Sequence, residues 1–134
     1  MSRHEITSED VDALLAFLPR FERPGRTFAR WGEAERNADG SVSPPFPVYE
    51  DDVEEFFKLI GQRGWIDYDY RPGEAGRMLD DDGLVARASL EQVRAMLTYC
   101  LRAERFGDGN WEALLKGGRI VALLKRLEAL RARM

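Results

Sequence analysis

The sequence predicts an all-α, mainly helical fold: a single compact domain over residues 1–134 with about five helices. Apolar residues recur every three or four positions in several separate segments, as on the buried face of a helix. Capping residues, glycines and prolines mark the ends of these segments. Only one short segment alternates in the way that a strand does, so we expect at most one short extended or two-stranded element.

Composition sets the broad class. With 134 residues, 44% of them apolar and 33% charged, the chain can bury a core without metal or disulfide bonds. Its longest apolar run is far shorter than the roughly 20 residues of a membrane span, and no apolar leader follows the basic residues at the N-terminus. A single cysteine fits a reducing compartment. We therefore expect a cytoplasmic protein without a membrane segment.

Charge is unevenly distributed along the chain. Residues 1–85 carry 10 basic and 19 acidic side chains, whereas residues 86–134 carry 10 and 5. Such a layout can present a basic surface to an anionic partner. We favour the simpler interpretation, in which the acidic segment packs beside the basic one within the same domain.

The first helix is predicted from Thr7 to about Leu18. Thr7 is a suitable N-cap, and the acidic residues after it suit the positive end of the helix dipole. Pro19 disfavours helix in the residue before it, so we expect the helix to end there. Its buried face is formed by Val11, Leu14, Leu15 and Leu18.

Residues 27–36 are ambiguous, because aromatic residues at helical spacing are followed by a glycine. Residues 37–47 are predicted as a loop, since Asp39-Gly40 favours a turn and three prolines exclude a regular ladder. The apolar residues around its end lead us to expect an ordered, proline-rich strap across the core: Phe46, Val48 and Tyr49.

A second helix begins at Glu50-Asp51-Asp52, whose charges complement the helix dipole. We prefer this explanation of the acidic cluster to a metal site. Gly61 or Gly64 is expected to supply a left-handed C-terminal cap. The buried stripe of this helix consists of Val53, Phe56, Phe57 and Ile60.

Trp65 to Tyr70 alternates between apolar and polar residues and predicts a short strand or extended edge. No convincing partner strand follows, so whether it pairs stays open. Residues 80–83 resemble the start of a calcium loop, but the sixth-position glycine and the alternating ligands of an EF-hand are missing. We expect no metal and no cofactor.

The last third of the chain gives the clearest pattern. Ser89 and Gln92 form a capping box that opens a helix reaching about Glu104. Cys100 lies in its apolar stripe, where a thiol away from basic residues is inert packing rather than a nucleophile. The stripe comprises Leu90, Val93, Met96, Leu97, Cys100 and Leu101.

Glu104 projects toward the apolar side of this helix, where an unpaired carboxylate costs on the order of several kcal/mol. It should therefore meet backbone donors or an arginine, and Arg94, Arg102 and Arg105 all stay open as partners. Glu104, Arg105 and Asp108 are the candidates for an anionic-ligand or catalytic site. We favour a structural ion pair plus a helix cap.

Two further helices follow. Phe106 is expected to anchor the turn, Gly107 to cap the preceding helix in the left-handed region, and Asp108 or Asn110 to cap the next one. That short helix buries Trp111, Leu114 and Leu115. The final helix, residues 119–133, is expected to expose a basic face that can bind phosphates or simply stay solvated: Arg119, Lys125, Arg126 and Arg133.

Several segments of the chain resemble the signature of a bacterial domain family of unknown function. In that family an ERF-x-DG core precedes a G-x-I helix start and a closing L-x-RL. The resemblance extends from about Trp31 onward and implies a fold and a bacterial origin but no activity. The family pattern has a glycine at Ala103 and often a cysteine at Gly107, so no role of that cysteine applies here. The matching segments are Leu97-Thr98-Tyr99, Arg102-Ala103-Glu104-Arg105-Phe106-Gly107-Asp108-Gly109, Trp111, Gly118-Arg119-Ile120 and Leu124-Lys125-Arg126-Leu127.

The residue inventory restricts the function. His4, the only histidine, lies at the expected frayed terminus, and the only cysteine is expected to be buried. This excludes Cys–His pairs and histidine metal sites, and we lean against an enzyme. We rank first a small protein-interaction, regulatory or accessory module that binds a protein partner or a second copy. Nucleic-acid binding through the basic C-terminal helix, and an anionic-ligand or enzymatic site around Glu104, are the alternatives.

Overall fold

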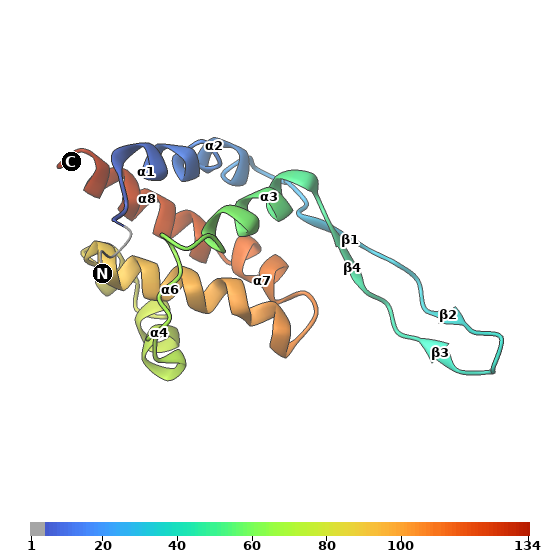
Figure 1. The fold of residues 1–134 in the computed structure, drawn as a ribbon. Coiled ribbons are helices and arrows are strands. Elements are labelled where there is room, and N and C mark those ends of the chain that lie inside the picture. Colours follow the sequence, from blue (N-terminus) through green and yellow to red (C-terminus); the bar gives the residue numbers. More distant parts are fainter. Residues whose placement is uncertain (1–4) are drawn as a thin grey trace.

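The computed structural model describes residues 5–134, so His4 lies outside the described residues. The chain folds into a helical body from which a long β-hairpin projects (Figure 1). The helices are α1 (Ser8–Leu15), α2 (Leu18–Phe21), α3 (Asp51–Ile60), α4 (Pro72–Leu79), α5 (Asp82–Val85), α6 (Leu90–Ala103), the 3-10 turn η1 (Glu104–Phe106), α7 (Asn110–Lys116) and α8 (Arg119–Arg131). The strands are β1 (Ala29–Trp31), β2 (Glu35–Arg36), β3 (Val42–Ser43) and β4 (Pro47–Tyr49).

Helix α8 lies at the centre of the body. It packs against α1 and α2 on one side and against α5, α6 and α7 on the others, while α3 and α4 pack on α6. Four of its apolar side chains are fully buried, as its periodicity predicts: Ile120, Leu123, Leu124 and Leu127. The stripes predicted for α3 and α6 join the same core, among them Phe56, Ile60, Met96 and Leu97.

The mainly helical fold is confirmed, but the expected number of about five helices is too low. The first helix ends at Leu15, and Pro19 stands in the first turn of the separate helix α2. The glycine-rich helix α4 was not predicted. Its Gly76 leaves room for the Tyr99 ring of α6, since an added Cβ would lie 3.4 Å from that ring. Tertiary packing here overrides weak intrinsic propensity.

The capping predictions had mixed outcomes. Thr7 and Ser89 both form the expected capping boxes. Neither Gly61 nor Gly64 adopts a left-handed conformation, so that prediction is wrong. The expected strand from Trp65 to Tyr70 is also wrong, because the segment forms turns in which Trp65 is buried. Its backbone is held instead by α6, where the Thr98 hydroxyl accepts a hydrogen bond of 3.0 Å from the amide of Asp67.

The expected strap across the core is the largest correction. Residues 29–49 form an antiparallel hairpin, here called the arm, that points away from the helices (Figure 1). β1 pairs with β4 and β2 with β3 in one constant register, because Ala29 faces Tyr49 at the base and Arg36 faces Val42 near the tip. Pro47 takes part in the β1–β4 ladder. Proline is tolerated there because β4 is an edge strand, on which a residue without an amide hydrogen can face solvent.

Candidate functional site

Glu104 bridges the arm and the C-terminal helices. Its carboxylate accepts hydrogen bonds of 2.9 Å from the amide of Gly109, from the amide of Trp111 and from the Tyr49 hydroxyl. The two amides belong to the N-cap and the first turn of α7. Glu104 therefore accepts hydrogen bonds from amides at the start of this helix, a role that was expected of Asp108 or Asn110. Of the partners left open by the sequence, backbone donors are found, and none of the three arginines contacts this carboxylate in the described structure.

The structure does not bring the side chains of the predicted trio of Glu104, Arg105 and Asp108 into contact with one another. Arg105 and Asp108 are both exposed, and neither forms an ion pair or side-chain hydrogen bond with another described residue. Phe106, expected as an anchor, is 85% exposed. Gly107 has an extended backbone with φ of 176°, and the left-handed residue is Gly109, with φ of 92°. Glu104 therefore acts as a structural bracket, without the ion pair that was expected beside it.

The predicted basic face of α8 is largely engaged inside the molecule. Arg119 donates to the carbonyl of Leu79 at 2.6 Å, and Arg126 donates to the carbonyl of Ala88 at 2.7 Å. Lys125 pairs with Glu22 at 3.3 Å. Two further ion pairs join α8 to acidic residues of the first 85 positions: Arg119–Asp80 and Arg131–Asp12. Arg133 is exposed. These contacts agree with the interpretation that the acidic segment packs beside the basic one.

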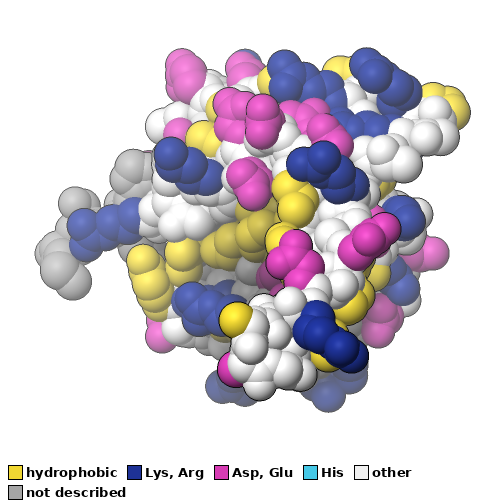
Figure 2. All heavy atoms as spheres, turned by 90° about the vertical axis from the view of Figure 1, so that its right-hand side faces the viewer, with side chains coloured by type: hydrophobic (Ala, Val, Ile, Leu, Met, Phe, Trp, Pro, Cys, Tyr) yellow, Lys and Arg dark blue, Asp and Glu magenta, His cyan; other side chains and the backbone are white. Residues whose placement is uncertain are grey.

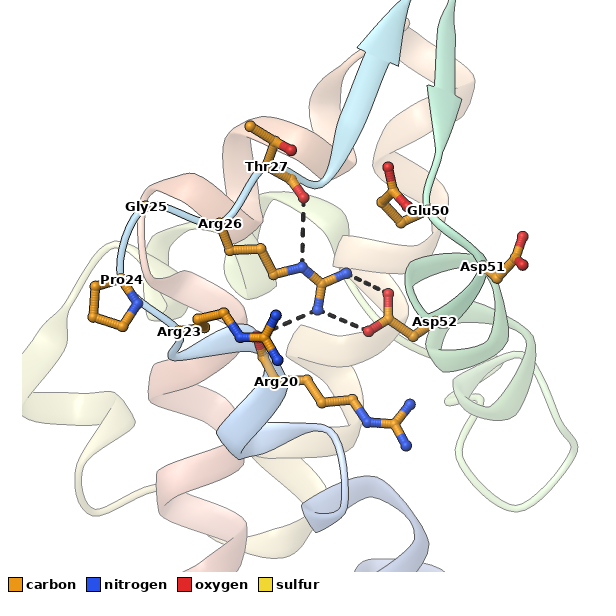
Figure 3. Close-up of a pocket in the computed structure, with 9 residues that line it drawn as sticks. All are labelled: Arg20, Arg23, Pro24, Gly25, Arg26, Thr27, Glu50, Asp51 and Asp52. Carbon is orange, nitrogen blue, oxygen red and sulfur yellow. Dashed lines mark hydrogen bonds and ion pairs between the residues drawn. The ribbon is translucent and has the colours of Figure 1, made fainter.

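A recess of about 740 Å³ lies between the end of α2 and the start of α3 (Figure 3). Its centre is occupied by Arg26, which forms a bidentate ion pair with Asp52 and donates to the carbonyl of Arg20 at 3.3 Å. This pair holds the pKa of the Asp52 carboxyl below its ordinary value. In Figure 3 the side chains of Glu50 and Asp51 point away from it. The charged groups at the centre of the recess thus satisfy one another.

The described residues bear on metal binding, thiol reactivity and membrane crossing. No three histidine, cysteine or acidic residues among them converge on one point. Cys100 is fully buried, and burial raises the pKa of its thiol to about 12, as the prediction of inert packing requires. None of the described helices combines the length and apolar character that a membrane crossing requires.

Comparison with known proteins places the whole fold in one family. Residues 6–133 match the model of a family described as "Family of unknown function (DUF6508)". The chain belongs to the DUF6508 family. No curated protein and no solved structure matches the chain.

The residues that carried the resemblance have structural roles in this DUF6508 chain. Glu104 starts α7 and holds Tyr49, while Gly109 and Gly118 adopt left-handed conformations before α7 and α8. Trp111 stacks on Phe57 with ring centroids 4.0 Å apart. These four residues thus act at the starts of α7 and α8 and at the base of the arm.

The arm has two chemically different faces. Because one register runs along the whole hairpin, alternate residues share a face. One face carries Ala29, Trp31 and Tyr49 at the base and acidic residues farther out. The other, here called the apolar arm face, consists of Val42, Pro44, Phe46 and Val48 flanked by Arg30 and Arg36. The Phe46 ring lies over Gly32, where an added Cβ would be 3.4 Å away.

Two contacts fix the arm to the body. The Tyr49 hydroxyl donates to Glu104, and burial together with this carboxylate raises the pKa of Tyr49 well above its ordinary value. The Trp31 indole donates to Glu112 at 3.1 Å. Its ring lies so close to Gly109 that a Cβ there would be 2.7 Å from it. The direction of the arm is therefore set by α7 and by the bracket residue.

Beside the base of the arm lies a groove between α3, α6 and α7. Its floor is formed by Phe57, Leu101 and Trp111, and its rims by Glu54 and Lys58, around a volume of about 350 Å³. Trp111 joins the groove to the arm, because its ring lies 5.3 Å from that of Tyr49. Figure 2, which views the molecule with the arm side toward the reader, shows hydrophobic side chains lining a hollow on this side.

Sequence reasoning missed the arm as a functional feature. The usable signal was the pair of residues Asp39-Gly40 at the centre of two short segments that match in length, as in a hairpin. The three prolines hid this signal, because proline within a segment argues against a central strand.

Proposed function

We propose that this DUF6508 chain is a small protein-interaction module, regulatory or accessory in role, that binds its partner through the apolar arm face. The observation that carries the proposal is where apolar surface is exposed. Among the described residues, seven large hydrophobic side chains are exposed, and three of them lie on the apolar arm face: Val42, Phe46 and Val48. Exposed apolar side chains gathered on one face in this way mark an interaction site.

The stability of the arm also supports a partner. An isolated two-stranded hairpin is at best marginally stable in water, because it has no third strand or helix to cover its apolar face. Beyond Trp31 the arm is covered by nothing in the body: Val42 is 59% exposed and Phe46 51%. A partner that covers this face would supply the burial that the hairpin lacks.

The residues of the arm favour binding of a partner on the apolar arm face over pairing of a strand with either edge of the hairpin. On the β3–β4 edge, Pro45 and Pro47 lack the amide donors that an added strand would need. On the other edge, the segment 33–36 carries three charged residues, which protect an edge against pairing. We therefore place the partner on the apolar arm face, where the charges of Arg30 and Arg36 favour an acidic rim around an apolar surface.

The alternatives have less support. A nucleic-acid interface would use the basic residues of α8, but Arg119 and Arg126 already bind backbone carbonyls of the chain itself. An enzymatic site at Glu104 would need its carboxylate free, whereas it accepts three different donors. We propose a cytoplasmic location, which a single unpaired and buried cysteine suits.

Site-specific photo-crosslinking in the host cell tests the proposal. A photo-reactive phenylalanine analogue at Phe46 should form a discrete protein adduct. The same analogue at Tyr68, an aromatic position that is 68% exposed and lies outside the arm, is the matched control. Adducts at position 46 that do not exceed those at position 68 would refute the arm as the contact surface.

A further inference from the structure

We infer that the partner of the apolar arm face is a second copy of this chain, whose groove at Phe57, Leu101 and Trp111 receives it. The inference rests on the proposed function and names its partner. It follows from three properties of the molecule: the form of the groove, the charges around both surfaces and the reach of the arm.

The groove is preformed and apolar. Phe57 and Trp111 are stacked nearly parallel, at 5°, and the Trp111 indole donates to the carbonyl of Leu101 at 3.0 Å. Its walls are therefore held by the core and need little rearrangement on binding. A volume of about 350 Å³ accepts side chains of the size that the arm presents, Phe46 and Val48. Because it is preformed, little ordering entropy opposes binding.

The charges of the two surfaces are complementary. The apolar arm face carries Arg30 and Arg36 and no acidic residue. The exposed charged residues of α3 are the acidic Asp51, Glu54 and Glu55 and the basic Lys58, and of these Glu54 and Lys58 line the groove. An arm docked along α3 would place its arginines against these carboxylates, which aids both encounter and register.

The arm can reach across to another molecule. From Tyr49 to the turn at Gly40 it extends roughly 30 Å at about 3.3 Å per residue, close to the diameter expected for a body of this size. The arm points away from the helical body, so the surface that it contacts belongs to another molecule (Figure 1). Reciprocal docking around a twofold axis uses each arm and each groove once and therefore closes as a dimer. Each chain would contribute an arm of about twenty residues, which is close to the number of residues per side in an interface of standard size.

Sedimentation equilibrium of the purified full chain tests the inference. We expect a reversible dimer of the 15.3 kDa chain. Phe46→Ser should weaken the dimer about a hundredfold or more, because a phenyl group leaves each of the two grooves and each loss costs about tenfold or more. Tyr68→Ser is the matched control and should leave dimerisation unchanged. Thermal melts of the isolated variants check that each is folded. A strict monomer at all concentrations, or a dimer indifferent to Phe46→Ser, overturns the inference.

Charge exchange tests the pairing of arm with groove. One variant carries Arg30→Glu and Arg36→Glu, and a second carries Glu54→Arg. Each alone removes the charge complementarity between arm and groove at both contacts and should dimerise at least tenfold more weakly. Mixed in equal amounts they should form a heterodimer, because every arm then meets a groove of opposite charge. Failure of the mixture to associate more strongly than either variant refutes the groove as the docking site.

The crosslinking at Phe46 separates this inference from the proposed function. An adduct with twice the mass of the chain supports the second copy. An adduct with a different protein, together with a monomer in sedimentation, overturns the second copy and leaves the arm as the contact surface. Absence of any specific adduct refutes both.

Discussion

Removing the carboxylate of Glu104 should destabilise the protein strongly. Glu104→Ala deprives Gly109 and Trp111 of the acceptor that starts α7, and it removes the acceptor of the hydrogen bond that the buried Tyr49 hydroxyl donates. Loss of a helix N-cap costs about 0.5–2 kcal/mol. An unsatisfied buried polar group costs about 1–3 kcal/mol. We expect a total loss of about 3 kcal/mol, which corresponds to a fall in Tm of roughly 10 °C for a chain of this size.

Urea denaturation followed by circular dichroism measures this loss. Glu128→Ala, an exposed glutamate in the last helix, is the matched control and should change the free energy of unfolding by less than about 0.5 kcal/mol. A double-mutant cycle of Tyr49→Phe with Glu104→Gln should give a coupling energy of about 1 kcal/mol or more. If Glu104→Ala costs under about 1 kcal/mol, or the cycle shows no coupling, Glu104 is not the bracket that joins the arm to α7.

Three further predictions concern other parts of the molecule. Gly109→Ala should lose about 1–3 kcal/mol of stability and shift the indole proton resonance of Trp31, since its Cβ would strain the backbone and displace that ring. Gly118→Ala has a similar φ but open space around it, so an equal effect of the two substitutions, or an unmoved resonance, would argue against the Trp31 contact. Because the folded-state pKa of Asp52 is lowered by Arg26, its stabilisation is present above the unfolded value of 3.8 and lost as pH falls through the folded value. Asp52→Asn should therefore reduce the loss of unfolding free energy that urea titrations measure as the pH is lowered. An unchanged dependence on acidic pH would contradict the ion pair of Arg26 and Asp52. The Cys100 thiol should react with thiol reagents only through unfolding, so its labelling rate should rise with urea. Above pH 9 stability should fall, because the unfolded thiol ionises there while the folded one, with a pKa of about 12, stays neutral. Rapid labelling in the native state would show that the thiol is accessible.

The helices were the most predictable part of the fold. Their signals are local: the capping boxes at Thr7 and Ser89 and the apolar stripes of α3, α6 and α8 each lie within a few turns of chain. The short helices α2, α4 and α5 were missed because their formation depends on what they pack against. Gly76 of α4, for example, lowers helix propensity locally but lets Tyr99 of α6 approach.

The candidate site was predictable in part. The sequence indicated that Glu104 needs a partner, because its position on the helix points toward the apolar side. It did not distinguish an arginine from backbone donors, and Tyr49, 55 positions away, was not considered. The basic residues of α8 were correctly assigned to one helix, but their acceptors, such as the carbonyls of Leu79 and Ala88, come from segments that only folding brings near.

The sequence by itself therefore determined the helical class and the buried stripes, since each follows from residue type and local spacing. Only the tertiary structure decided that residues 29–49 project as an arm and that Glu104 holds its base. The reason is physical: a helix closes its hydrogen bonds within a few residues, whereas a hairpin and a buried carboxylate depend on partners whose positions are fixed by the packed core.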